Sequence, residues 1–235
     1  MQSMLGINEK YLFYSRLRKF YKLKLISNVP NIIDVGSNKG QSIDFFLSLN
    51  SQSFIFGFEP NLKLFNKLKN KYQENARIEL QNIGVSSKIG TLRFFENVMD
   101  ETSTFEILNE NSVYLKRKAR ILGVTTNTII ADSYDVNVTT LKSFIENHPN
   151  TFFDVLKIDV EGHEFECLKG LFDDKKKTYP IKFIQLESHN DDMYVNSNNT
   201  EKLIEMLIEN GFSQIAKFKH GFGDFFEIVF ENNKL

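Results

Sequence analysis

One short stretch, residues 31–40, constrains the fold more than any other part of the chain. It begins with an apolar run that ends at Asp34 and Gly36, passes through a polar segment to Gly40, and then enters a helix-like sequence. This pattern predicts a buried strand, a tight turn and the start of a helix. In an open α/β sheet such a turn lies at the carboxyl end of a strand, where nucleotide-like ligands bind.

The glycines of this turn do not form the dinucleotide fingerprint G-x-G-x-x-G, because Asp34 stands where the first glycine would be. Alone, they are equally compatible with an ordinary strand-to-helix turn. The next predicted strand, residues 53–59, favours a ligand site because it is apolar and ends on Glu59. An acid there can bind both hydroxyls of a ribose. It can also act as a favourable negative charge at the start of the following helix, and the two roles are compatible.

Strand and helix patterns alternate along most of the chain. This alternation predicts the α/β class, with a mostly parallel, Rossmann-like sheet covered by helices. Further strands are expected at residues 76–86, 90–96, 128–131, 151–160, 182–189, 212–218 and 225–230, and helices at 41–49, 61–72, 112–122, 140–147 and 200–210. Another helix is expected after the turn at residues 161–164, with Phe165, Leu168 and Leu171 on one side. The last two strands are separated by a connection short enough for an antiparallel hairpin.

Bulk properties exclude several classes of function. The 235 residues contain 29 Lys and Arg against 30 Asp and Glu, and this balance gives no support for a nucleic-acid-binding face. No apolar run has the length that crosses a bilayer, and the first residues lack the apolar core of a signal peptide. The single cysteine, Cys167, cannot form an internal disulfide, so we expect a reducing, cytoplasmic compartment. A homo-oligomer remains compatible with these properties.

We divide the chain into an extension, residues 1–28, and a main domain, residues 29–235. The extension carries basic residues interleaved with aromatic ones at helical spacing. Such a helix can lie on a membrane surface or an anionic partner, or it can dock on the main domain. The aromatic content favours docking. Within the main domain, residues 97–135 are expected to form an insertion that faces the substrate.

Charged and polar residues gather at the ends of the strands predicted at 151–160 and 182–189. Alternation along a strand places every second residue on one side. The residues placed together in this way are Lys157, Asp159, Glu161, Gln185, Glu187 and His189, with His163 close by at the start of the following helix. In a doubly wound sheet the two strands are neighbours, so their ends would share one pocket beside the Gly36 turn. Burying such groups unpaired would cost several kcal/mol, which makes the cluster a site candidate.

Three interpretations of this cluster remain open. A carboxylate or imidazole can act as general base toward a substrate hydroxyl. Alternatively, Asp159, Glu187 and His189 could hold a divalent metal, although their spacing matches no dedicated metal motif, so we do not favour it. The third interpretation is a structural network in which Lys157 pairs with Asp159 or Glu187.

Several of these segments together resemble the FkbM-type methyltransferases. The matching segments are residues 33–40, 58–61, 139–141, 156–164, 168–170 and 184–189. The resemblance implies S-adenosylmethionine as cofactor and a seven-stranded class I methyltransferase sheet, which differs from a dehydrogenase sheet by its terminal antiparallel hairpin. It also implies O-methylation of a hydroxyl on a sugar, glycan or secondary metabolite.

The resemblance assigns cofactor residues by position. It places the cofactor loop at Asp34, Gly36, Ser37, Asn38 and Gly40, the ribose at Glu59, the adenine beside Asn82 and Gly84, and the methionine end under Ser103.

The resemblance also implies that Asp159, Glu161 and His163 face the methyl group of the cofactor. From these residues we expect Asp159 or His163 to act as base, with Lys157 and Glu161 orienting the reactants. In the same interpretation, Glu187 and His189 bind hydroxyls of a small-molecule or glycan acceptor.

Two other classes of function fit part of the sequence. A nicotinamide-dependent oxidoreductase would also use Glu59, but the missing first glycine and the terminal hairpin argue against it. A non-catalytic nucleotide-binding module would retain the fold, and the intact acidic cluster argues against that class.

Overall fold

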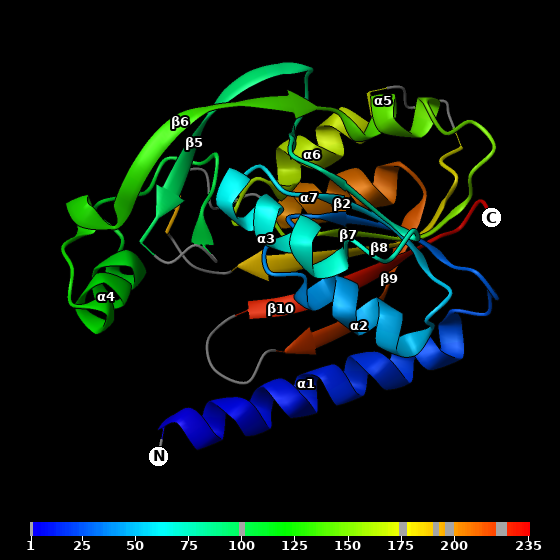
Figure 1. Ribbon diagram of the computed structural model, residues 1–235, viewed down its shortest axis with the longest axis horizontal. Helices are drawn as coiled ribbons and strands as arrows, with labels where there is room; N and C mark the ends of the chain where they lie inside the picture. Colours follow the sequence, from blue (N-terminus) through cyan, green and yellow to red (C-terminus); the bar gives the residue numbers. More distant parts are fainter. Residues whose placement is uncertain (1, 99–101, 174–177, 190–192, 196–199, 220–224) are drawn as a thin grey trace.

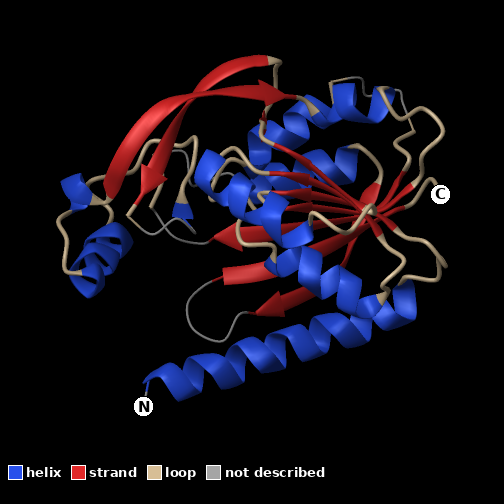
Figure 2. Cartoon of the chain, viewed as in Figure 1, coloured by secondary structure: helices blue, strands red, loops and turns tan. Residues whose placement is uncertain are grey.

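The computed structural model describes residues 2–98, 102–173, 178–189, 193–195, 200–219 and 225–235. Its centre is a seven-stranded sheet with the order β3-β2-β1-β7-β8-β10-β9, covered by helices on both faces (Figures 1 and 2). The strands of this sheet are β1 (Asn31–Val35), β2 (Phe54–Phe58), β3 (Ile78–Gln81), β7 (Phe153–Ile158), β8 (Ile181–His189), β9 (Phe212–Lys219) and β10 (Phe225–Asn232). β10 runs antiparallel to both β8 and β9, whereas the pairs from β3 to β8 are parallel. The predicted α/β class and terminal hairpin are therefore confirmed.

Seven α-helices and one 3-10 helix are described. They are α1 (Gln2–Lys24), α2 (Gln41–Leu49), α3 (Leu62–Tyr72), α4 (Val113–Leu122), η2 (Thr126–Thr128), α5 (Leu141–Glu146), α6 (Glu164–Leu171) and α7 (Thr200–Glu209). Each lies where the sequence pattern predicts an α-helix, except η2. None of these helices combines the length and the hydropathy that a membrane span requires.

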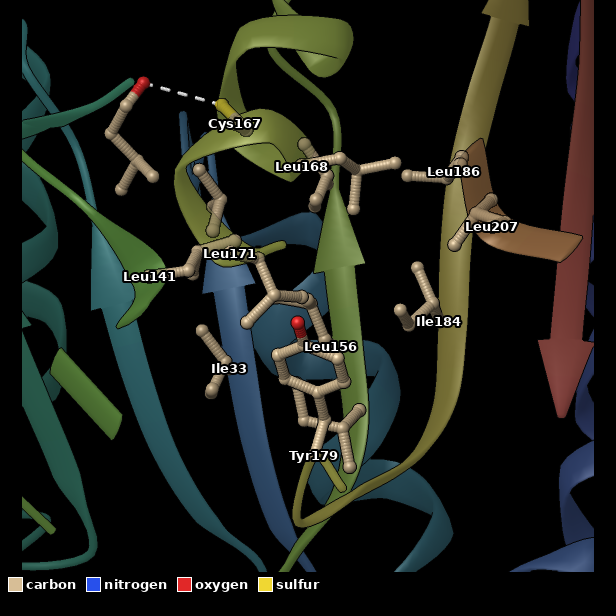
Figure 3. Packing of buried hydrophobic residues seen from close by; sticks show 14 of the residues in the cluster. Ile33, Leu141, Leu156, Cys167, Leu168, Leu171, Tyr179, Ile184, Leu186 and Leu207 are labelled. Carbon is tan, nitrogen blue, oxygen red and sulfur yellow. Dashed lines mark hydrogen bonds between the residues drawn. The ribbon is translucent and has the colours of Figure 1, made fainter. Parts of the chain in front are cut away.

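One face of the sheet packs against α5, α6 and α7. Side chains from β1, β7 and β8 point toward Leu168 and Leu171 of α6 (Figure 3). Cys167 belongs to this cluster and its Sγ donates to the Val85 carbonyl at 3.2 Å, so the cysteine is a packing residue. The alternate residues of the same strands face α1, α2 and α3. At the carboxyl ends of the strands, this second face changes from apolar to charged.

A second, three-stranded sheet has the order β4-β6-β5. Its strands are β4 (Gly84–Val85), β5 (Gly90–Asn97) and β6 (Ile130–Thr139). The long β5–β6 ribbon extends beyond the main sheet and carries α4 at its far end (Figure 1).

Two predictions for this region were wrong in detail. The single strand expected at 76–86 is broken into β3 and β4, which belong to different sheets. The break follows from Asn82, whose side chain donates to the carbonyls of Glu59 and Pro60 and turns the chain away. The strand expected at 128–131 instead starts at Ile130, after η2, and runs to Thr139.

Helix α1 docks on the main domain, where it contacts β9 and α2 (Figure 1). Phe13, Leu17 and Tyr21 recur every four residues and are buried against α2 and the sheet. Its basic side chains are less buried: Arg16 donates to the Lys219 carbonyl and Arg18 to Ser48. The sequence interpretation that favoured docking is thus the one observed.

Docking of α1 can be tested by two leucines on the same helix. Leu17 is 2% exposed and Leu23 is 74% exposed. We expect Leu17→Ala to lower the free energy of unfolding by about 2–5 kcal/mol, since it removes buried methyl groups and leaves a cavity. Leu23→Ala should change it by less than about 0.5 kcal/mol. Urea denaturation of both variants measures the difference, and equal effects would contradict a docked α1.

Candidate functional site

The turns after β1 and β7 lie in direct contact. Gly36 has φ = 84°, and a Cβ on it would sit 1.9 Å from the Asp159 carbonyl oxygen. The Asp159 amide donates to the Val35 carbonyl at 3.0 Å. Glycine is therefore required both by the left-handed backbone and by the neighbouring chain. This contact brings the predicted cofactor loop and the predicted acidic cluster to one edge of the sheet.

Glu59 ties the β2 end to this loop. Its carboxylate accepts from the Asn38 amide at 2.7 Å and from the Asn61 amide at 2.8 Å. Burial raises the pKa of Glu59 to about 7, although these two amide hydrogen bonds pull it down. Asn38 is held at φ = 49°, and its buried Oδ1 has no hydrogen-bond partner among the described residues. The Glu59 and Asn38 oxygens can thus accept hydrogen bonds from a ligand.

A group of apolar residues, which we call the apolar slot, lines the same cavity as Glu59. Ile83, Gly84 and Val85 form one wall, and the aromatic rings of Phe94 and Phe105 contribute to it. A Cβ on Gly84 would come within 2.5 Å of the Phe105 ring, so the ring packs directly on Gly84 and leaves no room for a side chain there.

Lys157 and Asp159 form an ion pair at the end of β7. The Lys157 Nζ lies 2.8 Å from Asp159 Oδ2, and the lysine is buried. Burial alone would lower the pKa of Lys157, but Asp159, Glu227 and Asp34 together raise it. Lys157 therefore keeps its charge, and the predicted structural pairing exists. Because Asp159 is partly exposed, the pairing leaves it accessible from the cavity.

Glu161 is held in an unusual conformation next to Asp159. It has φ = 53°, which non-glycine residues seldom adopt. The Thr104 hydroxyl donates to its carbonyl at 2.8 Å, and the Tyr194 hydroxyl donates to its carboxylate at 3.0 Å. Strain of this kind is concentrated at functional sites, where surrounding contacts maintain it.

Carboxylate oxygens of Asp159, Glu161 and Glu187 lie within 4.8 Å of one another. A divalent cation accepts such oxygen ligands. However, the Lys157 ammonium already neutralises one of the three acids. Metal binding thus stays an alternative that we do not favour.

His163 lies behind the cavity and does not face it. Its Nδ1 is 2.7 Å from Glu106 Oε1, and its Nε2 is 3.0 Å from Ser86 Oγ. The ring also packs against Phe105. The expectation that His163 faces the methyl group does not match this position. Its contacts instead connect the start of α6 to the loop that carries Thr104 and Phe105.

The loop residues and the acids line one cavity of about 220 Å³. Most of the residues predicted for the site contribute to its wall: Gly36, Ser37, Asn38, Glu59, Gly84, Ser103, Lys157, Asp159, Glu161 and Glu187.

Four predicted residues are placed elsewhere, and one is only partly described. Asp34 is fully buried behind the loop, where burial raises its pKa and Lys157 opposes the rise. Gly40 begins α2, and Asn82 holds the β2–α3 turn. His163 is the fourth. The side chain of His189 lies outside the described residues, although its backbone belongs to β8.

The cavity also has walls that no predicted role covered. Phe13, Tyr14 and Leu17 of α1 line it, and so do Gln185 of β8 and Glu227 of β10. Glu227 carried a signal, because an acid inside the apolar run of residues 225–230 is unusual. The α1 residues carried none, since aromatic residues at helical spacing predict docking equally well.

Comparison with known proteins agrees with this arrangement. A model of the Methyltransferase FkbM domain matches residues 34–213. The chain belongs to the FkbM methyltransferase family. The family resemblance noted from the sequence motifs is therefore confirmed.

Two kinds of relative extend the comparison. The chain is 28% identical over 157 residues to the hexuronic acid methyltransferase AglP of Haloferax volcanii, a match that covers 66% of this chain and 54% of that protein. It thus spans about half the length of that curated relative. Its fold is similar to the FkbM methyltransferase of Methylobacillus flagellatus (TM-score 0.53, 13% identity, 88% of this chain and 44% of that chain) and to an rRNA methylase of Streptococcus thermophilus (TM-score 0.50, 9% identity, 92% and 94%).

Because the turns after β1 and β7 are in contact, adding a single methyl group at Gly36 should strongly destabilise the fold. We expect Gly36→Ala to lower the free energy of unfolding by at least about 2 kcal/mol more than Gly123→Ala, because its Cβ collides with backbone. Gly123 also has a positive φ, 70°, but no described residue beyond its chain neighbours lies within 4 Å of its Cβ position, so it reports conformational strain alone. Thermal unfolding of both variants measures the difference. Equal losses would show that the turns are not in contact.

Proposed function

We propose that this FkbM-family chain is an S-adenosylmethionine-dependent O-methyltransferase that acts on a hydroxyl of a sugar or glycan. The observation that carries the proposal is a shared cavity. Glu59, the acid proposed to bind a ribose, and the apolar slot line one part of the cavity, and three clustered carboxylates line another. A methyl donor and an acceptor oxygen need such neighbouring places, because their reacting atoms must be held in line.

The residues present fit the cofactor. Glu59 would accept from the ribose hydroxyls and the slot at Gly84 would take the adenine, while the acids at Asp159 and Glu161 favour a positive charge nearby. When bound, S-adenosylmethionine supplies a methyl group on a positively charged sulfur. Asn38, whose Oδ1 has no hydrogen-bond partner in the described part of the chain, would accept a further hydrogen bond from the ligand.

Asp159 is the residue that we assign as general base. Of the two candidates from the sequence, it lines the cavity and His163 does not. The 2.8 Å ion pair with the Lys157 ammonium holds the Asp159 carboxylate in a fixed orientation. In this role the Asp159 carboxylate would accept the proton of the acceptor hydroxyl.

The buried Glu59 predicts that cofactor affinity depends on pH. With a pKa of about 7, Glu59 is mostly protonated at pH 6 and mostly ionised at pH 8. Because the ionised carboxylate is the better acceptor for two hydroxyls, affinity for S-adenosylhomocysteine should rise by up to about tenfold between these pH values. Glu59→Gln should bind more weakly and show no such rise. Titration calorimetry at both pH values tests this, and a wild type that binds at neither pH would refute the proposed function.

A second substitution separates catalysis from cofactor binding. We expect Asp159→Asn to lower kcat by about 10²–10⁴-fold, because the amide cannot accept the proton. Its affinity for S-adenosylhomocysteine should stay close to the wild-type value, which also shows that the variant is folded. Transfer of labelled methyl groups to a carbohydrate extract gives the rate, with Asp132→Asn on the exposed edge of β6 as the control. A variant with unchanged kcat would remove Asp159 from the mechanism.

A further inference from the structure

Two walls of the cavity come from outside the span that matches the family. The family match covers residues 34–213, whereas α1 ends at Lys24 and β10 begins at Phe225. Nevertheless, α1 contributes Tyr14 and β10 contributes Glu227 to the same cavity as Asp159. These two residues are therefore candidates for what distinguishes this chain from other members of the family.

A chain of buried hydrogen bonds fixes the position of both walls. The Tyr21 hydroxyl donates to Gln185 Oε1 at 2.6 Å, and Gln185 Nε2 donates to Glu227 Oε2 at 2.9 Å. Tyr21, Gln185 and Glu227 are all less than 5% exposed. The chain links α1 to β8 and β8 to β10, so Tyr14, two turns before Tyr21, is held at the cavity by the same contact. The hydroxyl of Tyr14 lies in the field of Lys157, Glu227, Asp159 and Glu187.

Acidic side chains outnumber basic ones among the described residues that line the cavity. Glu227 lies directly opposite Glu187 in the antiparallel register of β10 and β8. Like charges in that relation repel each other. Among the described lining residues there are five carboxyl groups, at Glu59, Asp159, Glu161, Glu187 and Glu227, and one ammonium group, at Lys157. That ammonium is already paired with Asp159 at 2.8 Å.

We propose that Tyr14, Glu187 and Glu227 form the acceptor subsite and that this subsite takes a sugar ring without an acidic group. Ionised carboxylates only accept hydrogen bonds, so they bind the hydrogens of hydroxyl or amino groups. The Tyr14 ring offers an aromatic surface for the apolar face of the sugar. A carboxylate or phosphate on the acceptor would add a negative charge to a wall that already carries an excess of them. By this charge pattern the chain differs in acceptor from a relative named for hexuronic acid.

The inference rests on the proposed function, and the experiment separates the two. The probes are methyl glucoside, methyl glucosaminide and methyl glucuronide, which share one ring and differ in charge. Saturation-transfer NMR with the full chain, loaded with S-adenosylhomocysteine at pH 7, measures their binding. We expect the glucoside and the glucosaminide to bind at least tenfold more tightly than the glucuronide. Tighter binding of the glucosaminide would identify an ammonium as the recognised group, and equal binding would identify the hydroxyls.

Variants test the assigned residues. Glu227→Gln should reduce the discrimination against the glucuronide to about threefold or less. Tyr14→Ala should weaken all three glycosides about tenfold while the affinity for S-adenosylhomocysteine stays within twofold, a pattern that a purely structural role would not produce. Glu205→Gln, on the exposed side of α7, removes the same charge elsewhere and should change nothing.

Three results would overturn the inference: equal binding of the glucuronide, no binding of either non-acidic glycoside, or unchanged discrimination in Glu227→Gln. Absence of S-adenosylhomocysteine binding to the wild type would instead refute the proposed function.

Discussion

The rest of the site depends on the contact between two backbone turns, one after β1 and one after β7. Gly36 approaches the Asp159 carbonyl so closely that no side chain fits between them, and the Asp159 amide bonds to Val35. Parallel strands β1 and β7 are adjacent, so their ends are already neighbours. Because Gly36 has no side chain, its backbone can lie in direct contact with the Asp159 carbonyl. The pocket proposed for the methyl donor and Asp159, the residue proposed to act on the acceptor, are therefore adjacent, and no long loop is needed to bring them together.

The same sheet explains why the charges gather on one face. On the face of the sheet that α1 and α2 cover, the residues of β7 and β8 are apolar near the amino ends of the strands. Near the carboxyl ends they are polar or charged. Val155 is followed by Lys157, and Phe183 by Gln185 and Glu187. The first members pack the core and the later ones line the cavity. One helix, α1, covers both parts, so its apolar contacts stabilise the fold and its Tyr14 reaches the site.

The parts that could be predicted from sequence are those whose evidence is local. The β1–α2 turn, the helix at 41–49 and the pairing of β7 with β8 follow from periodicity and from strand alternation. The orientation of His163 could not be predicted, because it is decided by Glu106, 57 residues away, and by Ser86. Likewise, the strand expected at 76–86 is interrupted by contacts of Asn82 with another turn. The contribution of Tyr14 depends on where a whole helix docks.

The electrostatics of the cavity show how binding and structure are connected. Burial raises the pKa of both Glu59 and Asp34, which means that the fold holds these carboxyl groups where ionisation is unfavourable. Lys157 offsets part of this cost for Asp34, and the same ammonium also interacts with Asp159 and Glu227. A ligand that brings positive charge or several hydroxyl hydrogens supplies the compensation that one lysine cannot. The acids that line the cavity therefore favour both a methyl donor with a positive charge and an acceptor with many hydroxyl groups.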